Sequence, residues 1–196
     1  MKFPLKASPL TLVSVLLLLS ASCKDKSGDN GESFFPVVSF LNSQVAMVDT
    51  SLYSIKRLDP VDSARTDTTF IPREDFRKAA AEFLSVPDIA SDEYRDRYRE
   101  TKQFDDGLNL VILTYDAIDR GREVLQSEQV TIKPGIGGDK VQNIIISMVT
   151  NSKDSSVEKK MLWNADKSFQ VSTIKQLPGR PETTGSYKVT WNESEY

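Results

Sequence analysis

The feature that most constrains the fold is a series of strand-like segments that begins after Gly107. They are rich in β-branched and aromatic residues and span residues 108–118, 123–133, 141–150, 156–163, 168–176 and 186–192. The links between them carry the Gly, Pro, Asn and Asp residues of turns, at residues 119–121, 134–139, 151–155, 164–167 and 178–185. Short links join antiparallel neighbours, because a parallel pair needs a crossover of about a dozen residues or more. The C-terminal half is therefore predicted to be an antiparallel meander.

Helical spacing of apolar residues is confined to the part of the chain before this series. The first predicted helix runs from Phe34 to Val48, with Pro36 in its first turn, where the missing N–H costs little. The second begins at Pro72 and is stopped by Pro87. Its buried stripe is predicted to be Phe76, Ala80, Phe83 and Leu84. Both helices have an apolar face that needs a partner, which the sheet can supply.

Two shorter runs between the helices also have strand character. Residues 51–58 alternate in polarity, and residues 64–71 are predicted to pair with them across the turn at residues 59–63. The predicted fold class is α+β, with one or two N-terminal helices packed on a mainly antiparallel meander sheet. At 196 residues the chain suits one domain, predicted to span residues 34–196.

Composition removes several classes of function. The net charge of −3 argues against a nucleic-acid binder, which normally presents a basic face to the phosphates. The chain has no histidine and a single cysteine, so histidine-based triads and zinc clusters are excluded. Catalysis would have to use carboxylates, lysines, tyrosines or serines without imidazole. We therefore expect a protein that is not an enzyme, with no cofactor and no metal site.

The first 22 residues have the organisation of an export signal. Lys2 and Lys6 give a positive start, and the apolar run from Leu10 to Leu19 is well short of the roughly 20 residues of a spanning helix. Small residues follow at positions 20–22, and Cys23 stands where an ordinary secretory signal would have its cleavage site.

This segment resembles a bacterial lipoprotein signal peptide, whose lipobox places small residues directly before a cysteine. The matching residues are Ser20-Ala21-Ser22-Cys23, and Leu19 lies one place further upstream than the leucine of the commonest pattern. The resemblance implies cleavage between Ser22 and Cys23. It also implies a diacylglycerol on the Cys23 thiol and usually a further acyl chain, such as palmitate, on the new amine. Two or more acyl chains hold a protein stably on a bilayer.

Residues 24–33 contain no apolar side chain and are predicted to be a flexible tether. A chain of this length reaches about 17 Å from end to end. Loss of Lys2 and Lys6 with the leader would change the net charge from −3 to −5. The alternative is a secreted protein with a free thiol at Cys23, which is unusual outside the cytoplasm.

Two segments invite a ligand-site interpretation. Arginines alternate with tyrosines and acids over residues 92–100, so Arg97 and Arg99 are candidates to hold a small anion. A surface strand or short helix with internal ion pairs explains the same pattern. The glycine-rich residues 134–140 lack the spacing of a phosphate-binding loop and favour a hairpin loop. Four aspartates could form a metal or acid-base site, but each lies at a strand end, where turns favour aspartate: Asp105, Asp106, Asp116 and Asp119.

The whole chain, from lipobox to antiparallel sheet, is similar in organisation to the small lipoproteins common in Bacteroidota envelopes. The resemblance implies a cell-envelope protein anchored to the lipid bilayer through acylated Cys23, in the outer membrane rather than the inner. It does not decide whether the protein lies on the periplasmic face or on the cell-surface face of that membrane. The first functional hypothesis is a non-catalytic protein that binds or scaffolds another envelope component. The alternatives are a carrier or sensor of a small apolar ligand and a histidine-free hydrolase.

Overall fold

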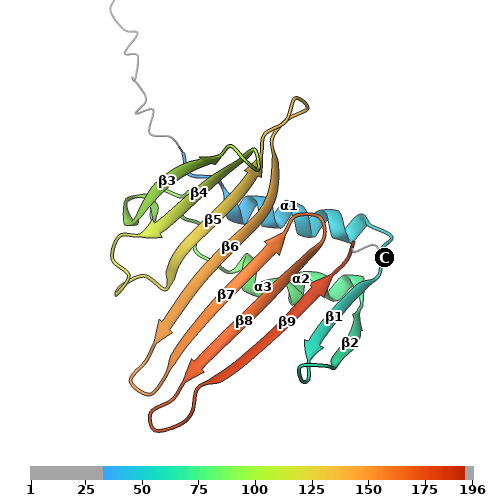
Figure 1. Cartoon of the computed structure of the whole chain (residues 1–196), viewed down its shortest axis with the longest axis vertical. Coiled ribbons are helices and arrows are strands. Elements are labelled where there is room, and N and C mark those ends of the chain that lie inside the picture. The colour runs from blue at the N-terminus through green and yellow to red at the C-terminus, as the bar shows by residue number, and fades with distance from the viewer. Residues whose placement is uncertain (1–32, 193–196) are drawn as a thin grey trace, which may run out of the picture. The chain divides into compact units, whose positions relative to one another are not determined.

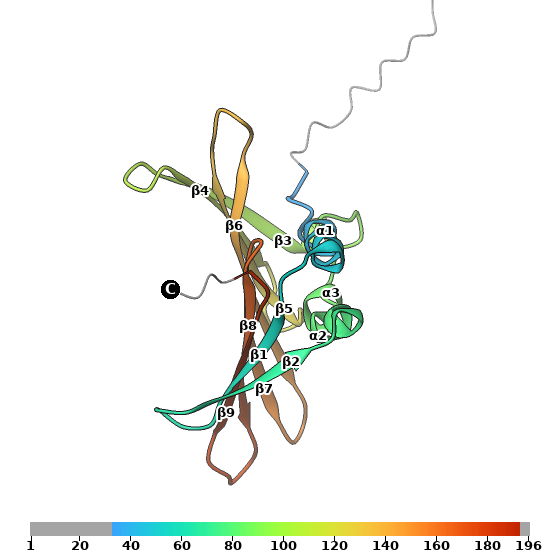
Figure 2. The same cartoon turned by 90° about the vertical axis from the view of Figure 1, so that its right-hand side faces the viewer.

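A computed structural model describes residues 33–192 and confirms the α+β class (Figure 1). The compact unit starts at Phe34 and contains one nine-stranded antiparallel sheet with helices on one face (Figure 2). The strands are β1 (Ile55–Pro60), β2 (Thr66–Ile71), β3 (Tyr98–Asp105), β4 (Leu110–Ala117), β5 (Leu125–Lys133), β6 (Lys140–Asn151), β7 (Ser156–Asn164), β8 (Ser168–Gln176) and β9 (Thr183–Thr190). The helices are α1 (Val37–Thr50), α2 (Phe76–Ala79) and α3 (Ala81–Leu84), with 3₁₀ turns η2 (Arg73–Asp75) and η3 (Arg95–Arg97).

The predicted meander is confirmed. The strand order is β2-β1-β9-β8-β7-β6-β5-β4-β3, so β3 to β9 each lie beside their sequence neighbours. All six strands expected after Gly107 are present, and β9 begins at Thr183, inside the segment predicted to be a turn. The segment predicted to be a strand or a short helix contains both, η3 followed by β3.

The N-terminal hairpin joins the far edge of this meander. Strands β1 and β2 pair as predicted, and β1 also pairs with β9, with Lys56 opposite Thr190. Sequence patterns gave no indication of the β1–β9 pairing. It makes one continuous sheet from both ends of the described chain.

Helix α1 confirms the predicted helix but begins at Val37, three residues after Phe34, so that Pro36 is its N-cap and not part of its first turn. Its buried face carries Val37, Leu41, Val45 and Val48. These side chains belong to the same core as the buried residues of the sheet. The apolar stripe read from the sequence is thus the face that packs.

The second predicted helix is broken, which corrects the expectation of one continuous element. The break lies at Ala80 (φ −87°, ψ 3°), where the Phe83 N–H donates to the Ala80 carbonyl over three residues. This hydrogen bond spans three residues instead of the four of an α-helix, and the chain changes direction between α2 and α3. Of the predicted stripe, Phe76, Ala80 and Phe83 are fully buried, and Leu84 is half-buried.

Aromatic rings fill the space between α2, α3 and the sheet. Trp163 of β7 stacks on Phe169 of β8 with ring centroids 5.3 Å apart and an interplanar angle of 16°. Phe83 meets Trp163 edge to face at 5.2 Å, and Phe76 meets Trp191 in the same way at 5.1 Å. Such contacts add to the energy of burial itself. The part of the core between α2, α3 and the sheet is therefore filled by packed aromatic side chains.

The helices cover only part of their face of the sheet. Figures 1 and 2 show β7, β8 and β9 continuing past α2 and α3 toward the lower end of both views. Within residues 33–192 no helix has the length and apolar character needed to cross a bilayer. The predicted signal peptide, Ser22, Cys23 and the tether up to residue 32 lie outside the described residues.

Candidate functional site

A polar and aromatic cluster lies on the helix side of the sheet at the border of α3, and we call it the open-face cluster. It consists of Arg57 of β1, Glu82 of α3, Lys159 of β7 and Tyr187 of β9. The strand order makes β1, β9, β8 and β7 consecutive neighbours, so residues distant in sequence meet here. Every strand contributes through the alternate residues that share the face of the buried Val171 and Met161.

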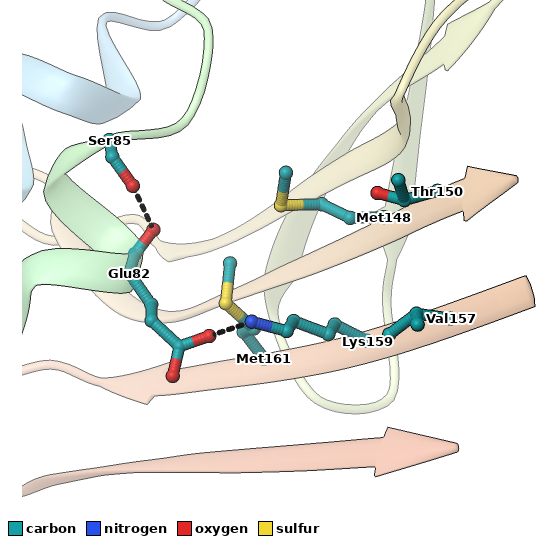
Figure 3. Close-up of a pocket in the computed structure, with 7 residues that line it drawn as sticks. All are labelled: Glu82, Ser85, Met148, Thr150, Val157, Lys159 and Met161. Atoms are coloured by element: carbon teal, nitrogen blue, oxygen red, sulfur yellow. Dashed lines mark hydrogen bonds and ion pairs between the residues drawn. The ribbon is translucent and has the colours of Figure 1, made fainter. Parts of the chain in front are cut away.

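The four side chains are joined by direct contacts. The Tyr187 hydroxyl donates to Glu82 Oε1 at 3.1 Å, and Lys159 Nζ donates to Glu82 Oε2 (Figure 3). The Arg57 guanidinium lies over the Tyr187 ring, 3.9 Å from its centroid, and pairs with Asp59 at 2.8 Å. Opposite charges and an aromatic ring therefore alternate across three strands and one helix.

Burial and neighbouring charges hold two of these groups in their ordinary protonation states. Burial raises the pKa of the Tyr187 hydroxyl, and the Glu82 carboxylate raises it further. The hydrogen bond to Asp59 raises the pKa of the Arg57 guanidinium. At neutral pH the tyrosine is a hydroxyl donor and the arginine is a cation. The arrangement suits recognition by hydrogen bonds and charge better than proton transfer.

A small cavity of about 130 Å³ lies beside the cluster (Figure 3). Its lining mixes charged, polar and apolar side chains, and consists of Glu82, Ser85, Met148, Thr150, Val157, Lys159 and Met161. Pockets for drug-sized ligands usually hold about 300–1,000 Å³. This cavity can accept a side chain or a few water molecules.

An open groove of about 920 Å³ lies toward the other end of the sheet. It runs along α1 and the first residues of β6, and its wall includes Phe35, Phe40, Gln44 and Val141. The turn between β7 and β8 closes one side through Asp166, which is bonded to Gln44. The lining mixes aromatic rings with amides and charged groups.

The structure places the two arginines proposed for anion binding in different surroundings. Arg97 ends η3, stacks over the Tyr94 ring at 4.8 Å and pairs with Glu123 at 3.6 Å. Arg99 lies in β3 opposite Asp116 of β4. The contacts of Arg97 are those of the ion-paired surface that the sequence offered as the alternative for this segment, and the anion site stays a prediction.

Three of the four aspartates considered for a metal site serve turns or ion pairs. Asp105 accepts the Leu108 N–H at 3.0 Å, and Asp119 accepts the Gly121 N–H at 3.0 Å. Asp116 pairs with Arg120 at 3.1 Å. In the described part of the chain no group of three or more potential ligand residues is placed to hold a metal ion.

Sequence reasoning missed one unusual residue, Glu128 of β5. Its side chain is fully buried, and neither carboxyl oxygen has a hydrogen-bond donor within the described residues. Burial, with a smaller contribution from Asp88, raises its pKa to about 8. The signal was present, since Glu128 is in phase with Val130 on the strand and therefore points to the core.

No protein-family model, no curated protein and no solved structure matches this chain.

Proposed function

We propose that this chain is a non-catalytic, lipid-anchored protein of the cell envelope that binds another envelope protein through the open-face cluster. Acylated Cys23 supplies the anchor, in the outer membrane rather than the inner. The folded unit supplies the binding surface. The observation that carries the proposal is the network of Arg57, Tyr187, Glu82 and Lys159 on an uncovered part of the sheet.

The chemistry of this cluster favours a protein partner. Tyrosine and arginine are enriched among the residues that dominate binding energy at protein interfaces. Here Arg57 and Tyr187 are held in place by Asp59 and Glu82, so little side-chain freedom would be lost on binding. The adjacent cavity of about 130 Å³ has the size to receive one partner side chain.

The carrier alternative has less support. An apolar cargo needs an enclosed apolar cavity, but the rings of Phe83, Trp163 and Phe169 fill the space between α3 and the sheet. The groove of about 920 Å³ is open and contains charged and amide groups. The hydrolase alternative would need two carboxylates that converge in a cleft, whereas Glu128 is enclosed in the core.

The anchor is tested by replacing Cys23 with Ala and labelling cells with radioactive palmitate. We expect the label and the membrane retention to be lost. The matched control is Ser22→Ala, which keeps a small residue before the cysteine and should be labelled like the natural chain. Unchanged labelling of the Cys23→Ala variant would refute the lipid anchor.

The binding surface is tested with a photo-crosslinking amino acid placed at one of two adjacent residues of β8. Thr173 lies opposite Lys159 and shares its face, whereas Ser172 faces the other side of the sheet. We expect one discrete cross-linked species in intact envelopes from position 173, and none from position 172. Combining the probe at position 173 with Arg57→Ala should reduce the amount of cross-linked product. Equal products from both positions, or none from 173, would contradict the proposed surface.

A further inference from the structure

The end of the sheet nearest the start of the folded unit carries a row of apolar side chains. Phe104, Val111, Ile132 and Val141 are successive partners across β3, β4, β5 and β6. They lie on the helix side of the sheet. Val111, Ile132 and Val141 are half-buried against the core, and Phe104 is 53% exposed. Phe35 and Phe40 border the same groove as Val141. The row is thus continuous with the first residues of the folded unit.

Two hairpin tips at this end add further apolar side chains. Leu108, in the β3–β4 turn, is 66% exposed, and Ile136, in the β5–β6 loop, is fully exposed. The register places both tips at one end of the sheet, since Val111 pairs with Ile132 just below them. The β5–β6 hairpin is the most prominent projection in the upper part of Figures 1 and 2.

The local geometry fixes Ile136 at the outermost point of its loop. The Gly138 N–H donates to the Gly135 carbonyl at 3.0 Å, which closes a turn with Ile136 and Gly137 at its centre. Turn tips are usually polar, and an isoleucine there exposes apolar area to water at a cost of up to about 25 cal/mol per Å². Phe104, Leu108 and Ile136 thus expose large apolar side chains at the same end of the sheet, as at a surface that contacts another protein or a membrane.

We propose that this apolar end, with Ile136 as its tip, inserts into the interfacial region of the lipid bilayer that carries the anchor. The inference rests on the proposed lipid anchor. A tether of about 17 Å joins the folded unit at Phe34, so the end that carries Phe35 stays within reach of the lipid surface. Apolar side chains at the tips would then be buried in the bilayer. Because the anchor already holds the protein at the membrane, their insertion does not cost the translational entropy of binding from solution.

The charges around the tips determine which lipids are required. Lys133 and Lys140 are partners at the base of the β5–β6 loop, while Asp105, Asp106 and Asp139 flank the same tips. Since both signs are present, attraction to anionic headgroups contributes little. Insertion should be similar in zwitterionic and anionic vesicles and insensitive to salt.

The test couples the chain from Cys23 onward, through the thiol of its sole cysteine, to a maleimide lipid in phosphatidylcholine vesicles. The core lies wholly between Phe34 and Trp191, so this chain keeps every core residue. Ile136→Trp supplies a reporter, and Val61→Trp is the matched control in the β1–β2 turn at the other end of the sheet. The natural Trp163 and Trp191 are buried and give a constant background.

We expect lipids brominated on their acyl chains to quench about half or more of the added emission of Ile136→Trp, as for a side chain at the headgroup boundary. Val61→Trp should not be quenched. Vesicles with 30% phosphatidylglycerol, or with added salt, should give the same result. Absence of quenching in Ile136→Trp on vesicles that demonstrably carry the protein would overturn the inference. In this test chemical coupling to the maleimide lipid replaces acylation in the cell. A negative palmitate experiment would therefore refute the natural anchor without deciding whether Ile136 inserts into a bilayer.

Discussion

Gln44 of α1 and Asp166 of the β7–β8 turn exchange two hydrogen bonds across the interface between helix and sheet. The Gln44 side-chain amide donates to Asp166 Oδ1 at 3.0 Å, and the Asp166 backbone N–H donates to Gln44 Oε1 at 2.8 Å. Gln44 is buried, and Asp166 adopts a positive φ of 61°. One side chain thus satisfies the backbone and the side chain of a strained turn, and it fixes α1 to the end of the sheet.

Replacing Gln44 with Ala should therefore lower the free energy of unfolding by about 0.5–1.5 kcal/mol, because both hydrogen bonds to Asp166 are lost while the exposed turn can bond to water instead. Urea denaturation followed by circular dichroism measures the change. Ser43→Ala is the control, since the exposed Ser43 hydroxyl bonds only within α1, to Phe40. Equal effects of the two substitutions would show that the interlayer contact contributes nothing.

The contrast between the two halves of the chain explains how much of this fold could be predicted. The meander follows from local information, namely strands of period two joined by short turns. The pairing of β1 with β9 and the contact of Gln44 with Asp166 depend on residues more than 100 positions apart, which no local pattern encodes. The break at Ala80 had no local signal either, since the apolar spacing of Phe76, Ala80 and Phe83 fits a continuous helix.

The candidate site was predictable to a smaller extent. Arg97 and Arg99 stood out because charged runs are visible in a sequence. The open-face cluster was missed because Arg57, Glu82, Lys159 and Tyr187 come from four elements and are unremarkable one by one. Glu128 could have been found, because the phase of its strand places it among buried residues.

Phe83 is predicted to be the most sensitive residue of the helix layer. Its ring centroid lies 5.2 Å from that of Trp163 and 5.1 Å from that of Phe169, and its side chain is fully buried. Phe83→Ala should reduce the free energy of unfolding by about 3–5 kcal/mol, through lost burial and a residual cavity. Phe83→Leu fills part of that space and should cost clearly less. Urea midpoints of both variants, compared at equal slope, test this ranking, and equal losses would argue against a tightly packed aromatic core.

Glu128 should make stability depend on pH in the direction opposite to a typical paired carboxylate. Its folded pKa of about 8 lies above the ordinary value of 4.5, so the folded state binds the proton more tightly. Its contribution is therefore fully present below pH 4.5 and decreases by about 1.4 kcal/mol per pH unit up to about pH 8. Urea unfolding across this range measures the slope.

The comparison with Glu128→Gln isolates this residue from the other titrating groups. The amide has a similar shape but no charge to bury, so the variant should lose the downward slope and exceed the natural chain in stability above pH 7. Glu128→Met should be at least as stable there, because it removes both unpartnered oxygens. Parallel pH profiles for the natural chain and Glu128→Gln would mean that the carboxyl is hydrated or paired in solution.

The glycines of the β5–β6 loop provide a last test, which bears on how Ile136 is presented. Gly138 has a φ of +109°, which side-chain-bearing residues rarely adopt, whereas Gly137 has no such restriction. A Cβ would meet nothing within 4 Å at either position, so only backbone strain distinguishes them. Gly138→Ala should lower the free energy of unfolding by about 1–2 kcal/mol, and Gly137→Ala should be neutral or slightly stabilising. If Gly138→Ala is as stable as Gly137→Ala, the turn closed by Gly135 and Gly138 is not maintained. In that case Ile136 is not held at the tip of the hairpin.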